Sequence, residues 1–149
     1  MIERCQECGA PLPAGGVCRD YFHELLALEG GFPGVPGSIL HFYAVATYNL
    51  QHPESSGLTA DAWESLRRNH ADALDGKAGV AELRARTRRT ADGPARVLRR
   101  DGEAPPAGRR RGDWPLTVVD VLGATAETYP SLVTSWARSV RDALAAAES

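Results

Sequence analysis

Three cysteines near the N-terminus have the residue type and spacing of a metal site. Cys5 and Cys8 are separated by two residues, and Gly9 directly follows the second of them. Two thiolates at this spacing can bind one tetrahedral ion, and the glycine lets the turn close tightly. Cys18 follows after nine more residues, where we expect the first helix to begin, and a helix N-terminus lowers the pKa of a thiol. The cysteines therefore predict three thiolate ligands for one ion.

Two other roles for these cysteines fit the sequence less well. Short paired cysteines in a chain that is not secreted indicate metal binding more often than free thiols. A thioredoxin-like redox site requires a strand before its Cys-x2-Cys motif, and no strand fits before Cys5. We therefore favour a metal, and soft sulfur ligands in a tetrahedral set select Zn²⁺.

The fourth ligand has to come from one of four histidines. The first helix and the next one are joined by a short Gly/Pro-rich segment, 30–37, so we expect an antiparallel hairpin. This arrangement brings Cys18, at the start of one helix, beside His52, at the end of the other. His41 lies eleven residues before His52, or about 16 Å along a helix axis, and is too far away to bind the same ion. His23, one turn after Cys18, remains an alternative, although we expect it on the surface.

The predicted ligands are therefore Cys5, Cys8, Cys18 and His52. Four protein ligands leave no open coordination position, which is typical of a structural zinc site. A site with three thiolates and a water in place of the histidine would instead support catalysis. The sequence leaves this enzymatic alternative open.

The opposite end of the expected hairpin predicts a second polar contact. Glu29 lies eleven residues after Cys18, and His41 lies eleven residues before His52, so the two should face each other. A carboxylate that touches a buried imidazole can orient it and keep it charged. Such a pair is a candidate for acid–base chemistry or for half of a second metal site, with Tyr43 or Tyr48 nearby. His70 is a further candidate for the same cavity, but a lone histidine on an apolar face is more often a packed boundary residue, and we favour that role. We favour a structural pair that fixes the hairpin register, because no nucleophile motif accompanies it.

Hydrophobic periodicity predicts an all-α fold, a small helical bundle with an N-terminal zinc-knuckle arm. The expected central helix lies between Ser38, a good N-cap, and Pro53, which cannot continue a helix. Apolar residues cover two faces of this segment, so little of it can be left facing water. Thr59 is a second expected N-cap. Further helices are expected at about residues 19–29, 60–75, 80–90, 117–126 and from 130 onward.

The length of 149 residues fits one domain with its own core. We divide it into five consecutive parts: the zinc-binding arm 1–18, the helical hairpin 19–53, further helices over 54–90, an Arg-rich loop over 91–113 and C-terminal helices over 114–149. The hydrophobic share of 43% and the charged share of 24% are ordinary for a globular protein.

Composition also bears on location and partners. The first ten residues are polar and contain two cysteines, which does not fit a secretory signal, and no apolar run is long enough to span a bilayer. Three cysteines cannot all pair with one another, so a secreted disulfide scaffold is disfavoured. We expect a cytoplasmic protein with no membrane association. A net charge of −2 gives no bulk attraction to nucleic acids or membranes.

Positive charge is concentrated in residues 84–111, which contain ten arginines and three acidic residues. Such asymmetry can mark a nucleic-acid surface. The stretch contains no aromatic residue on which single-stranded bases could stack, and no DNA-reading motif surrounds it. We therefore favour a solvated helix face and loop over nucleic-acid binding.

Several segments together resemble a family of small bacterial proteins of unknown function. They are CQECGA, CRDYFHELLALE, HFYAVATYNLQHP and WPLTVVDV, with a late WA-R-SV. The most specific is Tyr-x-Leu-Gln-His-Pro at residues 48–53. All six candidate residues lie within these segments, whereas residues 54–113 match little. The resemblance supports the map of candidate positions and implies no activity or substrate.

Three functional hypotheses follow from the sequence. The first is a zinc-stabilised helical protein that acts as a binding or accessory module for a protein or small-molecule partner. The second is a metal-dependent enzyme with a site around Glu29 and His41, or with an open three-cysteine zinc. The third is nucleic-acid binding through residues 84–111.

Overall fold

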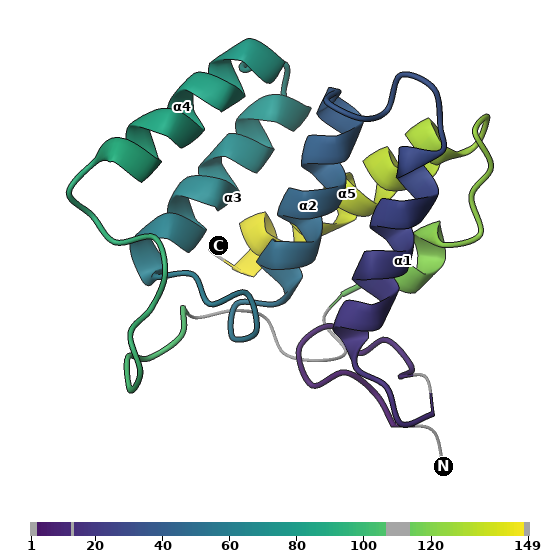
Figure 1. The fold of residues 1–149 in the computed structure, drawn as a ribbon, viewed down its shortest axis with the longest axis horizontal. Coiled ribbons are helices and arrows are strands. Elements are labelled where there is room, and N and C mark those ends of the chain that lie inside the picture. Colours follow the sequence, from purple (N-terminus) through teal and green to yellow (C-terminus); the bar gives the residue numbers. More distant parts are fainter. Residues whose placement is uncertain (1–2, 13, 107–113, 148–149) are drawn as a thin grey trace.

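The computed structural model describes residues 3–12, 14–106 and 114–147, and this part of the chain is helical without any strand (Figure 1). The all-α prediction is therefore confirmed. The elements are α1 (Cys18–Gly30), α2 (Ile39–Gln51), α3 (Ala60–Leu74), α4 (Val80–Asp92), the 3-10 helix η1 (Val118–Val121) and α5 (Tyr129–Ala147).

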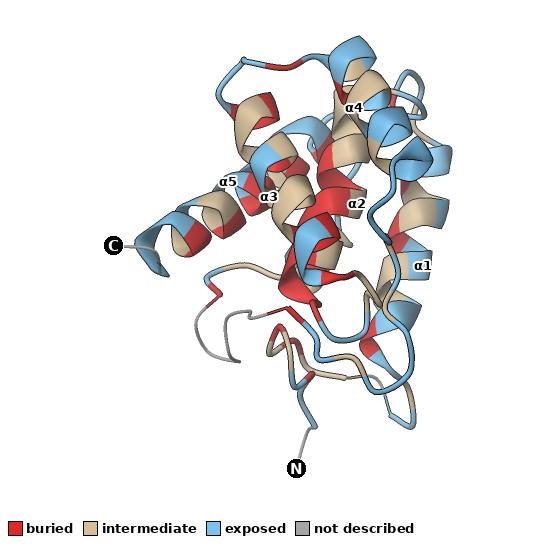
Figure 2. Cartoon of the chain, turned by 90° about the vertical axis from the view of Figure 1, so that its left-hand side faces the viewer, coloured by how far each residue is buried: buried red, intermediate tan, exposed pale blue. Residues whose placement is uncertain are grey.

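Helix α2 is the centre of the bundle, as predicted. Its N-terminus is capped by Ser38, whose hydroxyl accepts a hydrogen bond from the backbone N–H of Leu40 at 3.2 Å. It ends one residue before His52, because Pro53 cannot continue the helix. No residue of α2 is fully exposed, and the helix packs against α5 and α3 (Figure 2). Burial on several sides makes α2 a fixed support for residues at both of its ends.

Helix α1 runs beside α2 in the opposite direction. The rings of Phe22 and Tyr48 stack between the two helices with centroids 4.2 Å apart. At the start of α1, Asp20 accepts a hydrogen bond from the backbone N–H of Val17 at 3.1 Å, which suits the N-terminal end of the helix dipole. The antiparallel direction places the two ends of α1 beside opposite ends of α2.

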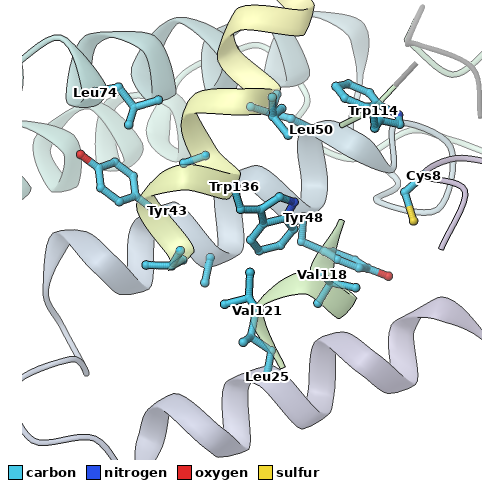
Figure 3. Close-up of a cluster of buried hydrophobic side chains, with 14 of the residues drawn as sticks. Cys8, Leu25, Tyr43, Tyr48, Leu50, Leu74, Trp114, Val118, Val121 and Trp136 are labelled. Atoms are coloured by element: carbon cyan, nitrogen blue, oxygen red, sulfur yellow. The ribbon is translucent and has the colours of Figure 1, made fainter. Parts of the chain in front are cut away.

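The remaining space between α1, α2 and α5 is filled by η1. Val118 and Val121 of η1 are buried with Leu25 of α1 and Trp136 of α5 (Figure 3). The sequence predicted a longer helix over 117–126. The observed element is a short 3-10 helix, in which each N–H bonds to the carbonyl three residues earlier. Bonds of the same type continue as turns up to Ala124.

Helices α3 and α4 form a second hairpin on the other side of α2. Thr59 caps α3 as predicted, and its hydroxyl accepts from the backbone N–H of Ala62 at 3.1 Å. Helix α4 extends two residues beyond the predicted Thr90, and Leu83 is its one fully buried residue. Helix α4 is thus the most loosely attached helix of the described chain.

The expected loop over 91–113 is more ordered than predicted where it is described. Residues 97–99 pair with the turn after α2: Thr59 N–H donates to the carbonyl of Val97 at 2.9 Å, and Arg99 N–H donates to that of Gly57 at 2.8 Å. The rest of the predicted loop, 107–113, lies outside the described residues. None of the described helices combines the length and the apolar character that crossing a membrane requires.

Candidate functional site

The four predicted metal ligands meet in one buried cluster. The ligand atoms of Cys5, Cys8, Cys18 and His52 all lie within 4.8 Å of one another. Cys5 Sγ lies 3.6 Å from His52 Nε2, and Cys8 Sγ lies 3.6 Å from Cys18 Sγ. In a tetrahedral zinc site with Zn–S bonds of about 2.3 Å, neighbouring sulfur atoms are about 3.8 Å apart. The cluster therefore has the size and donor set of a site for one metal ion.

The arm folds into a tight turn that presents two of these thiols. Cys5 N–H donates to the carbonyl of Ala10 at 2.8 Å, and Gly9 N–H donates to that of Cys5 at 3.0 Å. Gly9 has a φ of 84°, a conformation that glycine adopts without strain. The backbone N–H of Ala10 points at Cys8 Sγ from 3.5 Å, as suits a negatively charged thiolate. The predicted role of the glycine is thus seen in its backbone conformation.

His52 is held in position by the end of its own helix. Its Nδ1 donates a hydrogen bond to the carbonyl oxygen of Tyr48 at 2.6 Å, and its ring stacks on the Tyr48 ring with centroids 3.9 Å apart. Because Nδ1 is bonded to this carbonyl, Nε2 is the ring nitrogen that faces the thiols. A histidine fixed in this way needs little reorganisation to bind a metal.

A set of contacts around Glu7, between the two knuckle cysteines, ties the arm to the rest of the fold. The Glu7 carboxylate accepts from the backbone N–H of Glu54 at 2.7 Å and from the Ser55 hydroxyl at 2.6 Å. Its backbone carbonyl accepts from Trp114 Nε1 at 3.0 Å. These contacts were not predicted, because nothing in the sequence around a single glutamate indicates partners that lie so far along the chain.

The three thiols influence one another electrostatically. Hydrogen bonds with Cys18 and Cys8 lower the pKa of Cys5 well below its usual range, whereas the same contacts, chiefly that with Cys5, raise the pKa of Cys18. A lowered pKa was expected for Cys18, because it lies at a helix N-terminus. The pKa is raised instead, because repulsion between the thiolates of Cys18 and Cys5 is stronger than the stabilisation by the helix dipole. A divalent cation removes this conflict, so that all three thiols can act as thiolates.

At the other end of the hairpin, Glu29 and His41 form the predicted contact. Glu29 Oε1 is bonded to His41 Nδ1, and Glu29 is only 3% exposed. The second carboxylate oxygen accepts from the Tyr129 hydroxyl at 2.5 Å. The expected tyrosine neighbours were wrong: Tyr43 donates to the carbonyl of Ala73, and Tyr48 stacks on His52. The contact with Tyr129 was not predicted, because Tyr129 is one hundred residues from Glu29 in the sequence. Its position before Pro130 indicates the start of a helix and does not indicate a contact with Glu29.

The other two histidines take no part in these clusters. His23 is exposed on α1, as expected of a surface residue. His70 is buried, but Nε2 is hydrogen-bonded to Thr47 Oγ1 at 2.9 Å, on the side of α2 that faces α3. His70 is therefore a packed residue between α2 and α3, the role that we favoured for it, and does not take part in the His41 contact. Burial, helped by the positive charge of Arg141, lowers the pKa of His70 to about 4.

Most described arginines of the 84–111 stretch already have partners. Arg86 pairs with Asp72 at 2.7 Å and with Glu82 at 3.1 Å. Arg99 binds three backbone carbonyls, those of Pro53, Leu58 and Glu54, at 2.6–2.9 Å. These contacts hold the turn that follows His52. The arginines at 109–111 lie outside the described residues.

Comparison with protein families accounts for nearly the whole chain. The model of one family, described as a family of unknown function (DUF5946), matches residues 3–145. The chain belongs to DUF5946. The expected membership of a family without assigned function is thereby confirmed. No curated protein and no solved structure matches the chain significantly.

In this DUF5946 chain, the Tyr-x-Leu-Gln-His-Pro segment has a structural role beyond its histidine. Gln51 is fully buried between α2, α5 and the segment before η1. Its Nε2 donates to the carbonyl of Leu116 at 2.8 Å, and its Oε1 accepts from Trp136 Nε1 at 3.2 Å. The segment therefore joins the metal-ligand cluster to the core of the bundle.

Proposed function

We propose that Cys5, Cys8, Cys18 and His52 bind one zinc ion, and that this zinc is structural in a helical binding module. The observation that carries the proposal is the convergence of four buried ligand atoms from three separate segments within 4.8 Å. Three sulfur donors and one imidazole nitrogen in a tetrahedral arrangement are the donor set that selects zinc among the common divalent metals.

A structural rather than catalytic role is supported by the closed ligand set. His52 Nε2 lies 3.6 Å from Cys5 Sγ and is 1% exposed, so the fourth position is supplied by the protein. A catalytic zinc keeps one position open for water or substrate. The alternative of three thiolates and a water therefore has no support from this geometry.

The zinc would stabilise the N-terminal arm, which has little secondary structure of its own. The described residues of the arm, 3–12 and 14–17, contain no helix, and their β-type pairing is one isolated bridge between Arg4 and Pro11. One ion bound to this arm, to the start of α1 and to the end of α2 joins all three. Zinc-binding free energy then contributes directly to the free energy of folding. Thiolate ligands also require a reducing compartment, which favours the cytoplasm.

Metal analysis of the purified protein tests this proposal. We expect one zinc per chain, and loss of zinc together with loss of folding in Cys8→Ser and in His52→Ala. His23→Ala is the matched control, because it removes the exposed alternative histidine one turn after Cys18. A folded His52→Ala protein that keeps its zinc, or a wild-type protein that folds identically after zinc removal, would contradict the structural role.

A further inference from the structure

A groove lies between α2 and α4, at the end of α2 remote from the metal-ligand cluster. Its volume is about 450 Å³, within the range of small-molecule sites. The groove exists because α4 packs on α3 and buries only Leu83. The lining residues are Gly37, Ser38, His41, Phe42, Val45, Val80, Leu83, Arg84, Thr87 and Arg88.

The floor of the groove is apolar. Phe42 and Val45 come from α2, and Val80 and Leu83 come from α4. Together these side chains offer a surface for a hydrocarbon or aromatic group. Removal of such a group from water is favourable in proportion to the apolar area that is buried.

The charged groups of the groove are all positive. Arg84 and Arg88 are one helical turn apart on α4, both are exposed, and none of the described residues that line the groove is acidic. Arg84 reaches across it to donate to the carbonyl of Gly37 at 3.1 Å. Arg88 has no ion-pair partner among the described residues, whereas Arg86 pairs with acidic groups. Helix α4 thus directs its unpaired positive charge at the groove.

His41 adds an oriented hydrogen-bonding group. Its Nδ1 is bonded to the buried carboxylate of Glu29, and its ring lines the groove with 45% of the side chain exposed. Because Nδ1 is occupied, Nε2 is the ring nitrogen that a ligand can reach, and in the imidazolium form its N–H donates to a carboxylate. The Glu29–Tyr129 contact fixes the carboxylate, and the carboxylate fixes the ring.

We infer that this groove binds a small amphipathic carboxylate, with its apolar part on Phe42, Val45 and Leu83 and its carboxylate between Arg84, Arg88 and His41. Guanidinium groups recognise carboxylates through charge-assisted hydrogen bonds. The inference gives a ligand class to the proposed binding role and rests on that role, although the groove and the zinc ligands share no residue.

Calorimetric titration of the zinc-loaded full chain with decanoate tests the inference. We expect saturable binding of one decanoate per chain, at least tenfold weaker binding of methyl decanoate, which lacks the charge, and no binding of acetate, which lacks the apolar part. Arg88→Gln should weaken decanoate binding about tenfold, since it removes a charge-assisted contact. Arg100→Gln is the matched control: it removes an equally exposed arginine outside the groove and should leave binding unchanged.

A second variant tests the groove itself. Thr87 is exposed on α4 and lines the groove, so Thr87→Phe should fill the space and abolish decanoate binding while the protein remains folded. Equal binding of decanoate and methyl decanoate, equal loss in Arg88→Gln and Arg100→Gln, or absence of saturable binding would overturn the inference. Binding to phosphatidylglycerol vesicles without binding of free decanoate would overturn it too, in favour of a membrane surface. Zinc content is measured in every sample, so a failure here with full zinc occupancy is distinct from a failure of the zinc proposal.

Discussion

His52 Nδ1 donates a hydrogen bond to the carbonyl oxygen of Tyr48, 2.6 Å away, at the C-terminal end of α2. The last carbonyls of a helix have no partner within it, and the backbone N–H of His52 turns instead to Asn49. The imidazole therefore satisfies the carbonyl that the helix leaves free. The same bond determines which ring nitrogen faces the cysteines. One hydrogen bond therefore both caps the end of α2 and orients the metal ligand.

The first prediction concerns the identity of the fourth ligand. His52→Ala should weaken zinc binding more than about a hundredfold, because even changes to groups around metal ligands cost ten- to hundredfold. His52→Cys should keep a bound metal by supplying a fourth thiolate. In the cobalt-substituted protein, absorption spectroscopy should show stronger sulfur-to-metal charge transfer for His52→Cys than for wild type. Identical cobalt spectra for the two proteins would remove His52 from the ligand set.

The second prediction concerns the buried carboxylate at the other end of the hairpin. Tyr129→Phe removes the hydroxyl that donates to Glu29 and should lower the free energy of unfolding by about 1–3 kcal/mol. Urea unfolding with saturating zinc measures the effect. Tyr21→Phe is the matched control, because it removes a hydroxyl bound to the neutral carbonyl of Pro11 in a half-buried place and should cost about 1 kcal/mol or less. If Tyr129→Phe lost no more unfolding free energy than Tyr21→Phe, the hydrogen bond to the charged Glu29 would contribute no more to stability than one to a neutral carbonyl.

The sequence was sufficient to predict the contacts that follow from the α1–α2 hairpin alone. Once α1 and α2 are antiparallel, equal spacing along both helices brings Cys18 to His52 and Glu29 to His41, and the structure contains both contacts. Tyr129 could not be placed in this way, because its position depends on how α5 packs against the hairpin. Side-chain spacing within a helix is local information, whereas docking of a distant helix depends on the whole core.

The length of η1, which packs between α1 and α5, could not be predicted from local sequence either. The apolar run after Trp114 predicted a helix of about ten residues, but only Val118–Val121 form a 3-10 helix. Its residues Val118 and Val121 pack in the core with Leu25 and Trp136 (Figure 3). The groove between α2 and α4 could not be predicted from the sequence either, because it depends on the distance between these two helices in the fold.

The third prediction concerns the arginine-rich stretch. We expect negligible binding of single- and double-stranded DNA and of RNA at low salt, measured by fluorescence anisotropy. Arg86, Arg96 and Arg99 are already engaged by acidic groups or carbonyls, which reduces the positive charge that the stretch can offer to phosphates, and the stretch contains no aromatic residue for base stacking. The variant with glutamine at positions 109–111 should behave like wild type. Tight binding that weakens steeply with salt and is lost in that variant would contradict this prediction.

The last prediction follows from the buried His70. Its pKa is lowered to about 4 by burial, assisted by Arg141, whereas in the unfolded chain it should be near 6.5. Between these values the unfolded state binds more protons than the folded state, so stability falls as the pH falls. The loss should begin near pH 6.5, be complete near pH 4 and amount to about 3 kcal/mol from this residue.

Unfolding free energies of wild type and His70→Gln, measured across this range, isolate the contribution of His70. Protonation of the zinc ligands affects both proteins alike, so the difference between the two curves should change with pH only between about 4 and 6.5. His23→Gln is the matched control, because it makes the same substitution at an exposed position of α1. NMR titration of the His70 ring gives an independent reading: its signals should stay those of a neutral imidazole down to about pH 4. A ring that titrates near pH 6.5 in the folded protein would show that water reaches the space between α2 and α3, and would contradict the burial of His70 and Thr47.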